Sequence, residues 1–331
     1  MSCGRGFEAA SGVRLAGEIG DPAGCVWSRM PTSDTGTRVR IYTLGRFSVA
    51  IDGRQICSAG KAKQRPLALL KALIALGGRG VASSQVWECL WPDSEGDMAV
   101  RNLTVTLHRL RQLLGSNASI FQHDGKLTLN DQVCWVDAWS FERAANQGLS
   151  LQGDAACDVP PARRLWTALE LYSGHFLALE SEESWMLAAR LKLRIKFERV
   201  VTSLVGRLER DGAFADAIDS CLQGLERDPL NEILHQSLMC CYLKSGQPSQ
   251  VMRAYQRCRE ALDRGLGAAP SAQTHRLYVE AVQASSASPA QPVSAMLRTG
   301  MEVAVHGRRE RQSTSSAIVA EFDEAASSAL G

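Results

Sequence analysis

The sequence has no apolar run of the roughly 18–20 residues that a membrane span needs. Its longest candidate, Pro66 to Leu76, is interrupted by Lys71. The N-terminus also lacks the order of a secretory signal, in which basic residues precede an apolar stretch. We therefore expect a soluble, cytoplasmic protein with no membrane partner.

Motifs for metals, cofactors and catalysis are missing as well. The ten cysteines are scattered along the chain without a C-x-x-C pair, so we expect reduced thiols, and the six histidines show no metal-ligand spacing. The sequence lacks G-x-x-x-x-G-K-[ST], G-x-S-x-G and H-E-x-x-H. Glu180, Glu182 and Glu183 stand at an expected helix start, where carboxylates favour the helix dipole. We expect no enzyme, no metal and no cofactor.

What is present is enough chain for two domains, since 331 residues exceed the usual ~100–200 per domain. Residues 1–37 are rich in Gly, Ser, Ala and Pro and are expected to form a poorly ordered arm. Residues 38–140 mix strand and helix patterns, and residues 141–286 read as successive helices. Residues 287–331 lose the apolar pattern, and we expect a disordered tail.

Charge is divided unevenly between the two domains. From Arg38 to Lys126 there are 13 basic and 6 acidic residues, whereas Phe141 to Ser286 holds 17 basic and 18 acidic residues. The first domain is therefore basic although the whole chain carries only +2. Nucleic acid is the commonest partner for such a domain.

Strands, helices and a hairpin follow one another in the first domain. Two alternating stretches, 39–42 and 47–51, predict strands, and Asp52-Gly53 supplies a tight turn. Three helical patterns follow: one opening near Pro66 and stopping at Gly77-Gly78, a short one capped by Ser83 or Ser84, and one from Asp97 to Leu114. A hairpin over 120–129 turns at Asp124-Gly125. This order predicts a winged helix-turn-helix whose third helix enters the major groove.

The third helix has two contrasting faces. Its expected core face follows three-four spacing, and its opposite face carries no acidic residue after Asp97. Guanidiniums, amides, hydroxyls and a small apolar side chain are groups that read base edges in DNA. The core face comprises Val100, Leu103, Leu107, Leu110 and Leu114; the opposite face comprises Arg101, Asn102, Val105, His108, Arg109 and Gln112, flanked by Thr104, Thr106 and Arg111.

The first domain resembles the OmpR-type DNA-binding domain of SARP-family bacterial transcriptional activators. The resemblance rests on Leu44-Gly45-Arg46-Phe47, Lys61-x-Lys63-x-Arg65, Leu90-Trp91-Pro92-Asp93, Arg101-Asn102-Leu103-x-x-x-Leu107-x-Arg109-Leu110-Arg111 and Trp135-Val136-Asp137. It implies that Arg101 to Gln112, including Thr104 and Thr106, form the groove-reading helix. It also implies that Lys126 lies on the wing, and that Lys61, Lys63 and Arg65 contact phosphates before the first helix. The loop Pro92, Asp93, Ser94, Glu95 and Gly96 would face RNA polymerase.

The second domain shows a helical repeat. Gly212, Ala217, Ile218 and Cys221 recur 34 residues later as Gly246, Val251, Met252 and Tyr255, which is the period of tetratricopeptide helix pairs. Expected helices span 163–173, 184–209, 214–227, 231–245, 248–264 and 271–284. The segments Leu171-Tyr172-x-Gly174-x-Phe176-Leu177, Asp228-Pro229-Leu230-x-Glu232 and Tyr255-x-Arg257-Cys258-Arg259-x-x-Leu262 resemble the bacterial transcriptional activation domain of the same family.

The expected fold is therefore mainly α: a winged helix-turn-helix followed by an all-α, tetratricopeptide-like repeat domain. The expected function is a sequence-specific transcriptional activator that is associated with the nucleoid. Its expected partners are double-stranded DNA, with promoter direct repeats or similar sites, and RNA polymerase. A second copy in a homodimer and a protein or small-ligand effector at the helical repeat are further expected partners. Two alternatives stay open. One is a helical-repeat adaptor whose basic domain docks on an acidic protein, and the other is an enzyme of unrecognised type.

Overall fold

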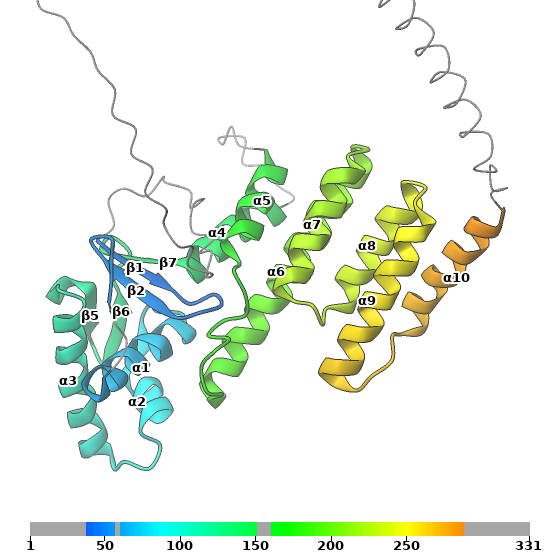
Figure 1. Ribbon diagram of the computed structural model, residues 1–331. Helices are drawn as coiled ribbons and strands as arrows, with labels where there is room; N and C mark the ends of the chain where they lie inside the picture. The colour runs from blue at the N-terminus through cyan, green and yellow to red at the C-terminus, as the bar shows by residue number, and fades with distance from the viewer. Residues whose placement is uncertain (1–37, 57–59, 151–159, 288–331) are drawn as a thin grey trace, which may run out of the picture.

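The computed structural model describes residues 38–56, 60–150 and 160–287. Within them a small α+β domain is followed by a mainly helical array, which confirms the expected fold class (Figure 1). Residues 1–37 and 288–331, for which the sequence predicts an arm and a tail, lie outside the described residues.

The first sheet joins the two ends of the first domain. Its order is β3-β2-β1-β7, and β7 pairs parallel to β1 whereas the other neighbours are antiparallel. The predicted turn is confirmed, since Asp52 and Gly53 both have positive φ angles, 48° and 79°. The strands are β1 (Val39–Tyr42), β2 (Ser48–Ile51), β3 (Arg54–Gln55) and β7 (Cys134–Val136).

Three helices and a second sheet complete the winged-helix order. The second sheet has the order β4-β6-β5, and the β5–β6 hairpin turns at Asp124 and Gly125 as predicted. The elements are α1 (Lys61–Ala75), β4 (Val81–Ala82), α2 (Ser83–Leu90), α3 (Gly96–Leu113), a 3-10 turn at Asn117–Ser119, β5 (Ile120–His123) and β6 (Lys126–Leu129).

Two helix starts differ from the sequence-based expectation. Helix α1 begins at Lys61, so Lys63 and Arg65 lie within it and not before it, and Pro66 is an interior residue. A proline there removes only one early backbone hydrogen bond, which leaves the first turn intact. Ala82 occupies the N-cap position of helix α2, which has no side-chain capping hydrogen bond. Ser83 is the first helical residue, and its buried hydroxyl has no hydrogen-bond partner in the described chain.

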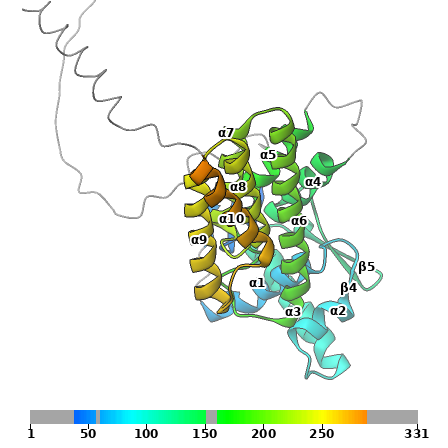
Figure 2. The ribbon, with the colours of Figure 1, turned by 90° about the vertical axis from the view of Figure 1, so that its right-hand side faces the viewer.

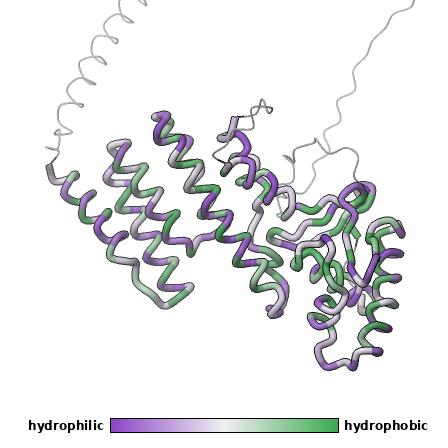
Figure 3. Tube along the Cα trace, turned by 180° about the vertical axis from the view of Figure 1, so that it is seen from behind, coloured by the Kyte–Doolittle hydropathy of each residue, from purple (hydrophilic) through white to green (hydrophobic). Residues whose placement is uncertain are grey.

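The second domain is an array of antiparallel helices that Figure 2 views from its α10 end. The 34-residue repeat is confirmed: α7 begins at Phe214 and α9 at Pro248, each after a glycine, Gly212 or Gly246, with φ near 70°. Hydrophobic and hydrophilic residues alternate along each helix (Figure 3), as expected for helices packed on one side. The helices are α4 (Asp137–Leu149), α5 (Pro161–Leu171), α6 (Ser184–Arg210), α7 (Phe214–Arg227), α8 (Glu232–Lys244), α9 (Pro248–Leu266) and α10 (Ala272–Ala287).

Helix α4 directly follows the last strand of the first domain, and its first residue, Asp137, ties the domains together. The Asp137 carboxylate is 4% exposed and accepts hydrogen bonds from the backbone N–H groups of Thr43 and Leu44, at 2.8 Å each, and from the Thr43 hydroxyl at 2.7 Å. The expected domain boundary at residue 140 thus falls inside α4, because the helix starts at residue 137.

The loop between β1 and β2 also pairs with the connection between α5 and α6. Leu44 forms a β-bridge with Phe176, while Gly45 donates to the His175 carbonyl at 2.9 Å and accepts from Ala178 at 3.0 Å. The Arg190 guanidinium, from α6, donates to the carbonyls of Phe176 and Leu177. These backbone contacts join the first domain to the helical array.

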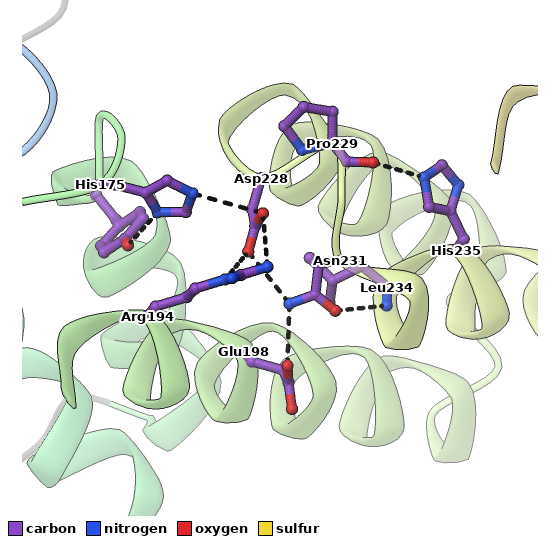
Figure 4. Close-up of polar contacts among 9 residues, drawn as sticks. His175, Arg194, Glu198, Asp228, Pro229, Asn231, Leu234 and His235 are labelled. Carbon is purple, nitrogen blue, oxygen red and sulfur yellow. Dashed lines mark hydrogen bonds and ion pairs between the residues drawn. The ribbon is translucent and has the colours of Figure 1, made fainter. Parts of the chain in front are cut away.

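A polar cluster around Asp228 holds the turn between α7 and α8 against α6 (Figure 4). The buried Asp228 carboxylate accepts from Arg194 at 2.8 and 3.3 Å and lies 3.5 Å from Nε2 of His175. Asn231 caps α8 by accepting from the Leu234 N–H, and its amide donates to Glu198 at 3.0 Å. Burial raises the pKa of Asp228, but the hydrogen bonds from His175 and Arg194 outweigh burial, so its pKa lies below the usual value.

His235 is the buried histidine beside this cluster. Its Nε2 lies 3.0 Å from the Pro229 carbonyl, and its Nδ1 has no hydrogen-bond partner in the part of the chain that the structure describes. Burial lowers the pKa of His235 below 6.5, and the hydrogen bond to Pro229 opposes that shift only in part. The folded protein therefore holds this imidazole neutral.

Among the described residues, no helix is long and apolar enough to cross a lipid bilayer. Cys89, Cys134, Cys221, Cys240, Cys241 and Cys258 are free thiols, as expected, while the other four cysteines lie outside the described residues.

We predict that Asp137→Asn lowers the free energy of unfolding by about 1–3 kcal/mol, because an amide accepts through one oxygen only and turns an N–H group toward buried donors. Urea unfolding monitored by circular dichroism measures this, with Asp93→Asn on an exposed loop as the matched control. A change within about 0.5 kcal/mol of the parent would contradict the role assigned to Asp137.

We also predict that His235 contributes to acid sensitivity. Below about pH 6.5 the unfolded chain protonates this histidine while the folded chain keeps it neutral, so unfolding takes up a proton and stability falls as pH falls. The loss between pH 7.0 and 5.5 should be smaller in His235→Gln than in the parent. Equal pH slopes for the parent and His235→Gln would show that burial does not suppress its protonation.

Candidate nucleic-acid interface

Helix α3 is held by its apolar face and presents its polar face to solvent. Leu103, Leu107, Leu110 and Leu114 are at most 3% exposed, and the helix packs against α1. This anchoring uses one side of the helix and fixes the orientation of the other.

The exposed face of α3 carries most of the predicted reading residues. Arg101, Val105 and Arg109 follow one another at intervals of four, so they lie in one row along the helix. Val105, the apolar member of this row, is 45% exposed. Thr104, His108 and Gln112 are exposed beside this row, and Asn102 is half-buried.

Two predictions about α3 are wrong. Val100, expected in the core, is 47% exposed, and Thr106, expected among the reading residues, is 7% exposed. The two residues lie on opposite edges of the leucine face, and α3 is rotated about its axis so that the Thr106 edge turns inward. Thr106 therefore has no surface to offer a base.

The wing is fixed to α3 by Arg111. Its guanidinium donates two hydrogen bonds, at 3.1 and 2.8 Å, to the carbonyl of Ile120 at the start of β5. Arg111 thus has a structural role, unlike the exposed Arg101 and Arg109. Past the wing turn, Lys126 is exposed, as is Phe121, which is 51% exposed on β5 and which sequence reasoning did not single out.

The predicted phosphate-contacting residues near α1 differ in exposure and in hydrogen bonding. Lys63 is half-buried, and the side chain of Lys61 lies outside what the structure describes. Arg65 is exposed and donates from Nη1 to the Leu90 carbonyl at 3.1 Å, so it joins α1 to the end of α2. The structure thus gives Arg65 a local partner that its sequence position did not reveal.

The loop predicted to face RNA polymerase is an exposed turn between α2 and α3. Pro92, Asp93 and Glu95 are exposed, Ser94 is half-buried, and Gly96 belongs to the first turn of α3 and not to the loop. Two apolar side chains just beyond it, Met98 and Val100, are 58% and 47% exposed. Sequence reasoning missed this apolar surface because it assigned Val100 to the core face of α3 and did not single out Met98.

Comparisons with known proteins agree with this architecture. Residues 136–281 match the family model of the bacterial transcriptional activator domain, a family of regulator domains and not of enzymes. No curated protein matches the chain.

Among solved structures, EmbR of Mycobacterium tuberculosis, in complex with a low affinity phosphopeptide, is similar at 20% identity with a TM-score of 0.50. The similarity covers 74% of this chain and 65% of EmbR, so this chain spans just under two thirds of that protein. At this identity the likeness establishes the fold. The family match begins at the end of β7, directly before α4. Residues 136–281 thus match the bacterial transcriptional activator domain, which confirms the predicted resemblance of the second domain to that domain of the SARP-type activators.

Proposed function

We propose that this chain is a transcriptional activator that binds double-stranded DNA sequence-specifically through α3 and the β5–β6 wing. The observation that carries the proposal is the exposed row of Arg101, Val105 and Arg109 on a helix whose other face is anchored by leucines. A row of this kind fits the major groove, where guanidiniums bind guanine edges and a small apolar side chain contacts a thymine methyl.

The residues have different proposed roles. At least one of Arg101 and Arg109 reads a base, Val105 contacts a thymine methyl, and Thr104, Asn102, His108 and Gln112 supply further polar contacts. Lys126 on the wing contacts a phosphate. Lys61, Lys63 and Arg65 on α1 are proposed phosphate contacts, and Arg65 also donates one hydrogen bond to the Leu90 carbonyl.

The loop from Pro92 to Gly96 is the proposed contact with RNA polymerase. Its exposed acidic residues, Asp93 and Glu95, stand next to the exposed apolar side chains of Met98 and Val100. Acidic and apolar groups side by side suit a protein partner better than they suit DNA, whose phosphates repel carboxylates.

Further partners are proposed for the helical array. Leu187, Leu191 and Ile195 follow one another at intervals of four on α6 and are 49%, 58% and 51% exposed. This apolar row is the surface available for a second copy in a homodimer or for an effector protein. Such an assembly would bind promoter direct repeats or similar paired sites and would associate with the nucleoid.

The adaptor alternative differs from this proposal in what the first domain binds. If the basic domain docked on an acidic protein, binding would depend on the positive charge of the domain and not on which side chains follow one another along α3. DNA recognition is favoured because the α3 face combines guanidiniums, amides and an exposed valine, which is more than a charged surface requires.

We predict that alanine replacement of Arg101 or Arg109 separates specific from non-specific binding. For at least one of them, affinity for the site selected from random DNA should fall by about 1–3 kcal/mol while affinity for random DNA changes much less. Fluorescence anisotropy on both DNAs measures this, with Arg253→Ala on α9 as the charge-matched control. Thermal melting of each variant guards against loss of packing by the arginine stem.

Lys126→Ala should behave differently, because a phosphate contact carries no sequence information. We predict that it weakens specific and random DNA alike and flattens the slope of log affinity against log salt by about one. If Arg101→Ala and Arg109→Ala both stay folded and bind the selected site as the parent does, α3 is not the reading helix and the proposal fails.

A further inference from the structure

A cleft of about 610 Å³ lies between the first domain and the start of the helical array. One wall is a stripe of α1 together with the end of α2, and the other is the segment from Glu180 to Met186, which leads into α6. Its volume falls in the range of about 300–1,000 Å³ that is typical of small-molecule sites. The cleft exists only because the domains dock, so no local sequence pattern indicates it.

One charged pair in the cleft is already satisfied. The Lys71 ammonium lies 2.7 Å from the Glu180 carboxylate and 4.4 Å from the centroid of the Phe47 ring. This ion pair and cation–π contact connect α1 to the segment before α6. Lys71 and Glu180 therefore neutralise each other and leave little charge for a ligand.

Two other charged groups in the cleft are not neutralised in this way. Arg65 donates from Nη1 to the Leu90 carbonyl, and within the described residues its guanidinium has no carboxylate partner. Glu183 is exposed, and its carboxylate makes no hydrogen bond or ion pair in the described ranges. The two groups come from different domains, so the cleft offers one cation on the α1 wall and one anion on the α6 wall.

The rest of the lining mixes apolar and polar groups. Leu90 and Trp185 are half-buried and expose apolar surface, Phe47, Leu67 and Met186 lie almost buried behind them, and Gln64, Ser181 and Cys89 add small polar groups. A ligand that carries only a negative charge would meet Glu183 unpaired, and one that carries only a positive charge would meet Arg65 unpaired. The lining therefore favours a molecule with both charges and an apolar body.

We propose that this interdomain cleft binds a small zwitterion with an apolar side chain, the chemistry of a free hydrophobic amino acid. Its carboxylate pairs with the Arg65 guanidinium, its ammonium pairs with the Glu183 carboxylate, and its side chain packs against Trp185 and Leu90. The ligand touches both domains and so stabilises their docked arrangement. The proposal goes beyond DNA and polymerase binding and does not depend on either.

The test uses Cys89, whose thiol lines the cleft, as a reporter in the full chain. Three probes share one ring: L-phenylalanine, 3-phenylpropionate without the amine, and 2-phenylethylamine without the carboxylate. Alkylation of Cys89 by iodoacetamide at pH 8 is followed on its peptide by mass spectrometry. L-Phenylalanine at about 10 mM should slow this alkylation several-fold, and each analogue should need about a tenfold higher concentration. Cys240 on α8, outside the cleft lining, should react at an unchanged rate and controls for global effects.

Two variants assign the charged contacts. In Arg65→Gln, L-phenylalanine should protect Cys89 no better than 2-phenylethylamine does, and in Glu183→Gln no better than 3-phenylpropionate does. Glu183 makes no side-chain capping hydrogen bond to α6, so Glu183→Gln tests the proposal even if Arg65→Gln fails to fold. Arg253→Gln and Glu226→Gln, on α9 and α7, are the matched controls and should behave as the parent.

The proposal is overturned if L-phenylalanine gives no protection of Cys89. It is also overturned if all three probes protect equally, since the cleft would then recognise only the ring, or if folded Arg65→Gln and Glu183→Gln both retain the parent's preference for L-phenylalanine.

Discussion

The buried carboxylate of Asp137 is the interaction on which the arrangement of this chain depends. It stands where the last strand of the first domain becomes the first helix of the second, and it holds the backbone of Thr43 and Leu44. That fixes the β1–β2 loop, which in turn pairs with the connection before α6. A buried polar group is stable only with its partners in place, so these contacts specify one docking of the domains.

A second set of contacts connects the docked first domain to the interior of the helical array. His175 accepts a hydrogen bond from Gly45 through its carbonyl, while its side chain faces Tyr172 and Asp228. The same residue thus contacts the first domain, the core of the array and the turn between α7 and α8. On the other side of the first domain, Arg111 ties the wing to α3. The proposed DNA-reading surface and the interdomain cleft are therefore built on one small, well-anchored domain.

Much of this fold follows from local sequence patterns. The β2–β3 and β5–β6 hairpins with their Asp-Gly turns and the 34-residue step of the array were predictable because each depends on neighbouring residues or on a repeated period. The rotation of α3 was not predictable, since Val100 and Thr106 sit at equivalent edges of its apolar face and only packing against α1 decides which one is buried. The same holds for Arg65, whose partner is 25 residues away, and for Asp137, whose partner Thr43 lies 94 residues back along the chain.

The central claim is that the exposed row of α3 lies in the major groove, and site-specific photocrosslinking tests it most directly. Benzoylphenylalanine placed at Val105 in the full chain is irradiated with DNA that the protein has selected from a random pool. The account predicts crosslinks to bases near the centre of the selected site, and none from the same group placed at Gln223 on α7. Crosslinks from Gln223 but not from Val105, or no crosslink from Val105 on DNA that is bound, would contradict it.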